Sequence, residues 1–328
     1  MSVTVDDVAI LLLADSSASL RRRALVELLD VPADDDEVGE LTAQVLSDPA
    51  IAALLTDETT ELRQLSFNLC RLAYAGLTRD HPRVAELAEA VLAHQQPDGG
   101  FPLSAFAGSR PRYDMVPLQT AIPLRGLAAV GYAGDPRAER AYDWLLGRRL
   151  PDGSWPTARA AGQAGYVAGY RRLPAAAGCR TNTTGALACL ALHPSRATSD
   201  EARVALDLLL QRETRDEWAL GAEVARLVGV EPVAGFMTFY ARFDLAFVLE
   251  LATRSGAAED DPRLSDLIAF LESRRGRSGL WEHPSHPELS RWLTFDILLS
   301  LRRLVHGDWV GAAFRTSFRA YPRQRRRY

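Results

Sequence analysis

Apolar residues recur at helical spacing along most of the chain. The segment 262–273 carries four of them at positions i, i+3, i+4 and i+7, the pattern of a helix that buries one face. They are Leu264, Leu267, Ile268 and Leu271. Two other segments, LAFVLELA at 245–252 and ILLSLRRL at 297–304, are apolar almost all round, which is typical of helices packed on several sides. The pattern predicts an all-α chain with half-solvated outer helices and buried inner helices.

Proline positions mark where several of these helices begin or bend. Asp135-Pro136 and Asp261-Pro262 each place proline in the first turn of an outer helix, where its missing N–H costs nothing. Pro123 lies within the inner-helix pattern PLQTAIPLRGLAAV and predicts a kink there.

A polar turn that ends in an aromatic residue follows several outer helices. RRLPDGSW ends at Trp155 and HQQPDGGF ends at Phe101. Proline presets φ, aspartate bonds the backbone ahead, and glycine accepts positive φ, so these residues favour a tight turn. Looser versions end at Trp218 and Trp281, and the three tryptophans are 63 residues apart. Such a period indicates stacked helical hairpins, each too small to bury its own apolar face, with the aromatic residues packed between repeats.

The runs HQQPDGGF and RRLPDGSW resemble the glutamine-tryptophan motif of the prenyltransferase and squalene-cyclase repeat proteins. The resemblance covers roughly residues 82 to 305 and implies a fold in which inner and outer helices close into a ring. We therefore expect an all-α (α/α) toroid of about five or six hairpins. Within it, residues 1–80 would form helices that complete or pack on the ring, and 81–312 the repeat domain. Residues 313–328 would form a basic C-terminal tail.

The composition of the chain limits the classes of partner and the cellular surroundings that we expect. The net charge of −4 argues against broad nucleic-acid binding. Three cysteines, without CxxC spacing, fit reduced thiols in a cytoplasmic protein. The apolar run 8–14 is too short to span a bilayer, so no transmembrane segment is predicted. No prediction of oligomeric state follows.

Aligning the repeats backwards from the inner helices places Thr120, Thr183, Asp244 and Asp296 at roughly equivalent positions near helix starts. An aspartate there would cap its helix, which is worth about 1 kcal/mol. The resemblance implies another role. Cyclases of the family protonate an alkene or epoxide with an Asp-x-Asp-Asp motif, whose neighbouring carboxylates and burial keep the acid protonated. The matching positions here read ARFD and LTFD, so only the last aspartate remains in each, at Asp244 and Asp296.

Asp244 and Asp296 are therefore the candidate catalytic acids, acting without the full motif. Arg242, if it faces the same way as Asp244, would lower the pKa of that carboxyl. The acidic run 34–37 is similar to the motif in composition, but its place at a helix start predicts helix capping instead.

Aromatic residues cluster just before the inner helices, where their π faces would stabilise a carbocation by about 0.5 to 2 kcal/mol per contact. The candidates are Tyr113, Tyr240, Phe243 and Trp292, with core packing as the alternative. Arg180 and Arg242 would orient polar or charged groups of the substrate, and Asp114 is a further candidate for substrate binding. The loop 157–178 also carries arginines.

These features together predict a terpene-cyclase-like enzyme that binds an isoprenoid in a central aromatic cavity and starts carbocation cyclisation with an acid. One alternative is a non-catalytic toroid that binds a ligand or a partner. Another is an α/α-toroid enzyme that acts on a glycan or other hydroxylated substrate. No cofactor or metal is predicted, because the zinc-binding Asp-x-Cys of the family is missing at Cys179, and the pair His283 and His286 has no third ligand in sequence.

Overall fold

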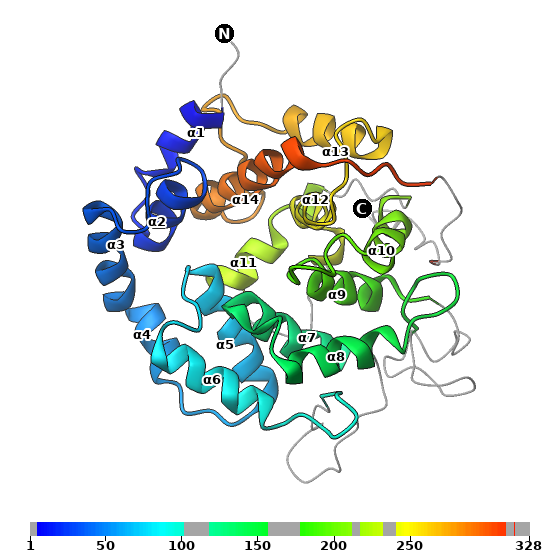
Figure 1. Cartoon of the computed structure of the whole chain (residues 1–328). Helices are drawn as coiled ribbons and strands as arrows, with labels where there is room; N and C mark the ends of the chain where they lie inside the picture. The colour runs from blue at the N-terminus through cyan, green and yellow to red at the C-terminus, as the bar shows by residue number, and fades with distance from the viewer. Residues whose placement is uncertain are drawn as a thin grey trace, which may run out of the picture.

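The computed structural model describes residues 5–101, 118–156, 178–211, 217–231, 241–312 and 318. The described part is helical, with only isolated β-bridges, and its helices form an (α/α) toroid (Figure 1). The inner helices are α2 (Ala18–Glu27), α5 (Leu62–Tyr74), α7 (Leu118–Leu127), α9 (Arg180–Leu190), α12 (Leu245–Arg254) and α14 (Ser290–Arg303). The helices farther from the centre are α1 (Val5–Leu12), α3 (Asp36–Ser47), α4 (Pro49–Thr56), α6 (Pro82–Leu92), α8 (Pro136–Leu146), α10 (Asp200–Leu210) and α13 (Pro262–Ser273).

Several helix starts follow the sequence. Asp135 and Asp261 cap α8 and α13, each followed by proline in the first turn, and Asp35 caps α3 within the acidic run. These predictions are confirmed. Pro123 lies inside α7, and this helix continues into a π-helical turn at Ala128–Tyr132.

Three of the aromatic-terminated turns share a backbone hydrogen bond to a threonine of an inner helix, and two of them add a second bond. The backbone N–H of Trp155 donates to Oγ1 of Thr183 at 3.0 Å, and its indole Nε1–H donates to the carbonyl of Leu145 at 2.8 Å. Trp281 repeats both bonds, to Thr294 at 2.9 Å and to the carbonyl of Leu271 at 2.8 Å. Each indole thereby joins the end of an outer helix to an inner helix. Both are completely buried, as the repeat pattern predicts.

Phe101 forms the corresponding contact in the first turn, because its N–H donates to Oγ1 of Thr120 at 3.0 Å and its ring is completely buried. The turn glycines adopt left-handed backbone, with φ of 94° at Gly99 and 87° at Gly153. A Cβ on Gly153 would lie 2.2 Å from Cγ1 of Val204 on α10, so glycine also lets successive repeats approach.

Trp218 departs from the pattern. Its side chain is 61% exposed in the 3₁₀ turn Glu217–Ala219, so the prediction that it packs between repeats is wrong. The sequence before it, QRETRDE, contains no glycine, and the other three turns each use one at positive φ. In the absence of such a glycine, the Trp218 side chain lies at the surface instead of between the helices.

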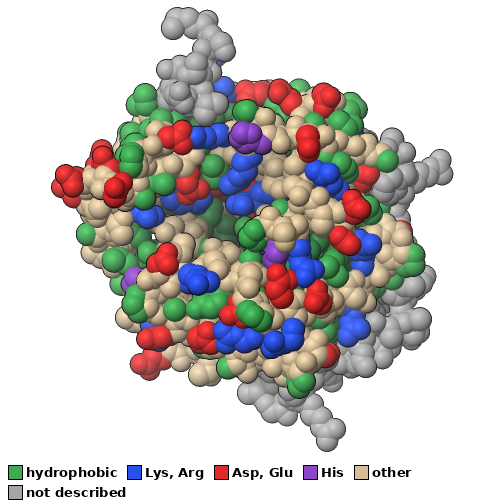
Figure 2. All heavy atoms as spheres, in the orientation of Figure 1, with side chains coloured by type: hydrophobic (Ala, Val, Ile, Leu, Met, Phe, Trp, Pro, Cys, Tyr) green, Lys and Arg blue, Asp and Glu red, His purple; other side chains and the backbone are tan. Residues whose placement is uncertain are grey.

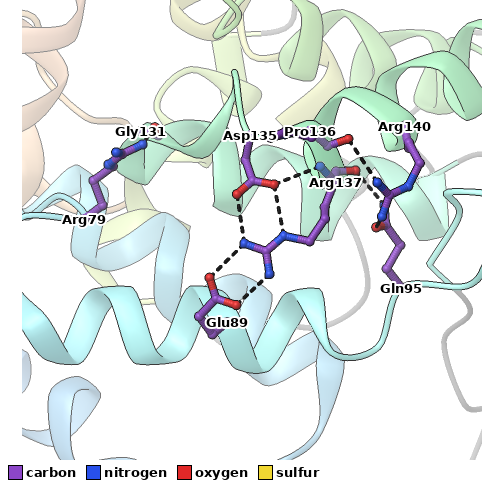
Figure 3. Close-up of polar contacts among 8 residues, drawn as sticks. All are labelled: Arg79, Glu89, Gln95, Gly131, Asp135, Pro136, Arg137 and Arg140. Carbon is purple, nitrogen blue, oxygen red and sulfur yellow. Dashed lines mark hydrogen bonds and ion pairs between the residues drawn. The ribbon is translucent and has the colours of Figure 1, made fainter.

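The ring is held by polar contacts on its outside and where its first and last inner helices meet. On the outside, Arg137 of α8 donates to both carboxylate oxygens of Glu89 on α6, at 2.7 and 2.8 Å, and also to Asp135 (Figure 3). An exposed pair of this kind contributes about 0 to 1 kcal/mol, so it fixes geometry more than stability. At the other place, Arg302 of α14 donates to the carbonyls of Glu27 and Leu28 on α2.

Candidate active site in the centre of the ring

A short helix, α11 (Ala222–Val228), lies inside the ring of inner helices (Figure 1). Glu223 on this helix pairs with Arg125 of α7 at 2.5 Å and with Arg226 at 2.7 Å, and all three side chains are largely buried. Arg226 also lies over the ring of Phe67 on α5, at 5.0 Å. Figure 2 shows that the centre of one face is hollowed beside this region, with basic side chains along one wall and apolar side chains deeper inside.

Asp244 anchors α11 to the start of α12. Its Oδ1 accepts the N–H groups of Gly221 at 3.0 Å and Ala246 at 3.1 Å, and its Oδ2 accepts that of Glu223 at 2.9 Å. The side chain is completely buried, so the capping interpretation is confirmed. Burial raises the pKa of Asp244 to about 7, although the three backbone donors oppose this. Arg242 donates to the hydroxyl of Thr181, and the lowering of the Asp244 pKa considered from the sequence is not observed.

Asp296 is placed differently, on the inner face of α14 and partly exposed. Its Oδ2 accepts a hydrogen bond from the Tyr74 hydroxyl at 2.9 Å. Burial raises the pKa of Asp296 to about 8, and the nearby charge of Glu250 adds to this effect. Asp296 is therefore a carboxylic acid that keeps its proton at neutral pH. It does not occupy the position of Thr120 and Thr183, because Thr294 makes the equivalent bond; the alignment from the sequence was two residues out.

Glu250 of α12 is the ionised neighbour of Asp296. Its Oε1 accepts from Nε of Arg254 at 2.8 Å. Burial opposes the ionisation of Glu250, but the positive charges around it prevail and lower its pKa. These charges belong to Arg254, Arg303 and Arg125. Two interacting carboxyl groups whose pKa values are pushed in opposite directions are the usual arrangement of a general acid and its ionised partner.

The aromatic and basic residues beside Asp296 form one packed wall. Trp292 is 6% exposed and stacks on Tyr74, with ring centroids 4.9 Å apart. The guanidinium group of Arg23 lies 4.5 Å from the Phe295 centroid and pairs with Glu27 at 2.6 Å. Trp292 supports the orientation of Tyr74, and through it that of the acid. Direct contact of Trp292 with a substrate stays a prediction.

Arg180, Arg242 and Phe243 form a second cluster between α9 and the 3₁₀ turn Ala241–Phe243. All three are buried, and the two guanidinium groups lie 5.5 and 4.7 Å from the Phe243 centroid. Arg180 donates to the carbonyls of Arg242 and Leu209. This cluster contributes to packing between repeats, and its predicted part in substrate binding stays a prediction. Tyr113, Asp114 and Tyr240 lie outside the described residues, as do residues 157–177 and, apart from Phe318, the tail 313–328.

The described residues contain no group of three or more His, Cys, Asp or Glu side chains arranged to hold a metal ion. His283 is occupied: its Nδ1 accepts the N–H groups of Ser285 and His286, and its Nε2 contacts the carbonyl of Gly221 at 3.0 Å. The three cysteines are buried and form no disulfide. None of the helices described here has the length and apolar character needed to cross a membrane.

Sequence reasoning missed Tyr74, Glu250 and the arginines that surround them. Tyr74 comes from a helix that precedes the first turn motif, where no repeat register could place it. Glu250 and Arg254 lie in a segment whose apolar residues indicated burial. Their spacing of four residues, which suits a salt bridge on one helix face, was the available signal.

Comparison with known proteins shows three solved structures that align with this chain. No family model and no curated protein sequence matches the chain. The type II terpene cyclase MstE from Scytonema aligns at 15% identity with a TM-score of 0.46, over 92% of this chain and 97% of that one. A protein from Actinoplanes aligns at 14% identity with a TM-score of 0.46, over 92% and 100%. An unsaturated glucuronyl hydrolase from Bacillus sp. GL1, responsible for the degradation of glycosaminoglycan, aligns at 15% identity with a TM-score of 0.48, over 93% and 87%.

The cyclase and the hydrolase both have α/α toroid folds.

Proposed function

We propose that this protein is an acid/base enzyme that acts on a hydroxylated substrate, such as a glycan, in the central hollow. Asp296 would be the general acid and Glu250 the ionised partner. The observation that carries the proposal is the interaction of these two carboxyl groups across the neighbouring inner helices α14 and α12, in a ring whose face has a central hollow with charged side chains around it (Figure 2). Charged and hydrogen-bonding walls suit a substrate rich in hydroxyl groups better than a hydrocarbon.

The chemistry follows from the two protonation states. Asp296 donates its proton to the oxygen of the bond that breaks, so that this oxygen leaves as a hydroxyl group. Glu250 takes a proton from a water molecule, whose oxygen bonds to the carbon left behind. The Tyr74 hydroxyl holds the Asp296 carboxyl in place, since it donates to the oxygen Oδ2. Asp244 takes no part in this scheme, because both its carboxylate oxygens accept backbone N–H groups at the start of α12 and α11.

Acid-initiated cyclisation of an isoprenoid is the second candidate. It is favoured by the same neutral acid, which could add its proton to an alkene carbon, and by the apolar side chains deep in the hollow (Figure 2). The electron pair of a second alkene would then close the ring, and loss of a proton would end the reaction.

One substrate panel separates these candidates. Purified protein is incubated with neutral and acidic oligosaccharides, linear prenyl diphosphates and squalene, and products are identified by mass spectrometry. We expect cleavage of an oligosaccharide that is abolished in Asp296→Asn and Glu250→Gln but kept in Glu89→Gln, which alters an exposed carboxylate on an outer helix. Cyclised prenyl products that vanish in Asp296→Asn would instead establish the second candidate. Turnover that persists in Asp296→Asn would refute both.

A further inference from the structure

Arg303 differs from the other arginines around the hollow. Arg23, Arg125 and Arg254 each pair with a carboxylate, at 2.6, 2.5 and 2.8 Å respectively. Arg303 is partly buried at the end of α14, and within the described residues it forms neither a hydrogen bond nor an ion pair. It lies close enough to Glu27, Glu250 and Asp296 to interact with their charges. This cation beside the proposed site therefore has carboxyl groups nearby but no direct partner among the described residues.

Arg303 shares a face of α14 with Asp296. It follows Asp296 by seven residues, which is two helical turns, so both side chains project from the same side of the helix. At a rise of 1.5 Å per residue, their Cα atoms are about 10 Å apart along the helix axis. The neighbouring cation, Arg254, occupies the last turn of α12, which packs beside α14.

Neither the helix dipole nor the nearby carboxyl groups give Arg303 a direct partner. A cation in the last turn of a helix gains about 0.3 to 1 kcal/mol from the helix dipole. Burial outweighs that gain and, together with repulsion from Arg254, lowers the pKa of Arg303 to about 10. The guanidinium group remains charged at neutral pH. The charges of Glu27 and Glu250 compensate it only in part, because neither carboxylate forms a direct hydrogen bond or ion pair with it, and a bound anion would supply that direct partner.

We propose that Arg303 binds an anionic group of the substrate, a carboxylate or a phosphate, at the end of the hollow about two helical turns from Asp296. The planar guanidinium fork matches two oxygens of either anion, and Arg254 adds a second positive charge. This inference rests on the proposed function and narrows its substrate class to acidic molecules. Binding of the substrate's anionic group by Arg303 would set which bond of the substrate lies beside Asp296.

Binding of small anions tests this without any catalysis. D-glucuronate and inorganic pyrophosphate are titrated at low ionic strength into the wild type, Arg303→Met and Arg140→Met, with detection by calorimetry. Arg140 is a matched control because it loses the same charge from the outer helix α8, where its bonds are long, at 3.5 and 3.2 Å. We expect Arg303→Met to weaken binding by about tenfold or more, and Arg140→Met to leave it unchanged. The anion that binds more tightly identifies an acidic sugar or a phosphorylated substrate.

One further measurement keeps the inference separate from the proposed function. Asp296→Asn should still bind the anion, so retained binding in a protein without turnover would support the anion site alone. Equal anion affinity in Arg303→Met and the wild type, or no anion binding by the wild type, would overturn the inference.

Discussion

Replacement of Asp244 by asparagine separates a structural carboxylate from a catalytic one. In the native protein, Oδ1 accepts two N–H groups, from Gly221 and Ala246, and Oδ2 accepts a third, from Glu223. Asparagine has one carbonyl oxygen, which can keep the first two bonds. Its amide NH₂ group would then face the N–H of Glu223, donor against donor. One hydrogen bond is lost, and a buried N–H is left unsatisfied, at a cost of about 1 to 3 kcal/mol.

Asp244→Ala removes all three acceptors and should cost more than Asp244→Asn. Urea denaturation followed by circular dichroism measures both free energies of unfolding, and the m-value shows whether the transition stays two-state. Asp296→Asn is the matched comparison on the next inner helix, because the asparagine carbonyl can still accept from Tyr74. If Asp244→Asn unfolds within about 0.5 kcal/mol of the wild type, the capping interpretation is refuted.

Two further predictions concern Asp296 and the tryptophans. The pKa of Asp296 is about 8 in the folded protein and near 3.8 when unfolded, so its contribution to stability is full below pH 3.8 and is lost as pH rises toward 8. The free energy of unfolding of Asp296→Asn, relative to that of the wild type, should therefore increase as the pH rises from 3.8 to 8. Denaturation curves at several pH values measure this difference, and a constant difference would contradict the raised pKa of Asp296. Trp155→Ala should cost roughly 3 to 5 kcal/mol because the indole is buried, whereas Trp218→Ala, 61% exposed, should change the unfolding midpoint little; equal losses would disprove the distinction.

The repeat signal was strong enough to predict the fold. Two turn motifs have proline, aspartate and glycine at fixed offsets, and these residues favour a tight turn by their own backbone preferences. Phe101, Trp155 and Trp281 lie where that geometry requires. Trp218 shows the limit: its spacing matched the period, but the glycine that turns the chain was missing.

The site was less predictable because it is assembled from separate repeats. A register error of two residues placed Asp296 with the capping residues, whereas Thr294 has that role and Asp296 faces the interior. Tyr74 and Asp296 are 222 residues apart, and no periodicity relates them. Capping is a local property that a sequence displays, whereas the shift in an acid's pKa depends on which distant side chains exclude water from it.

The seven-residue length of α11 bears on how the centre of the ring folds. A helix of this length is not stable by itself in water. Contacts with the rest of the ring hold it in place. Glu223 bonds to Asp244 and pairs with Arg125, and the carbonyl of the N-cap residue Gly221 contacts His283. We therefore expect that α11 cannot form ahead of the helices around it, so that it folds only when the ring closes.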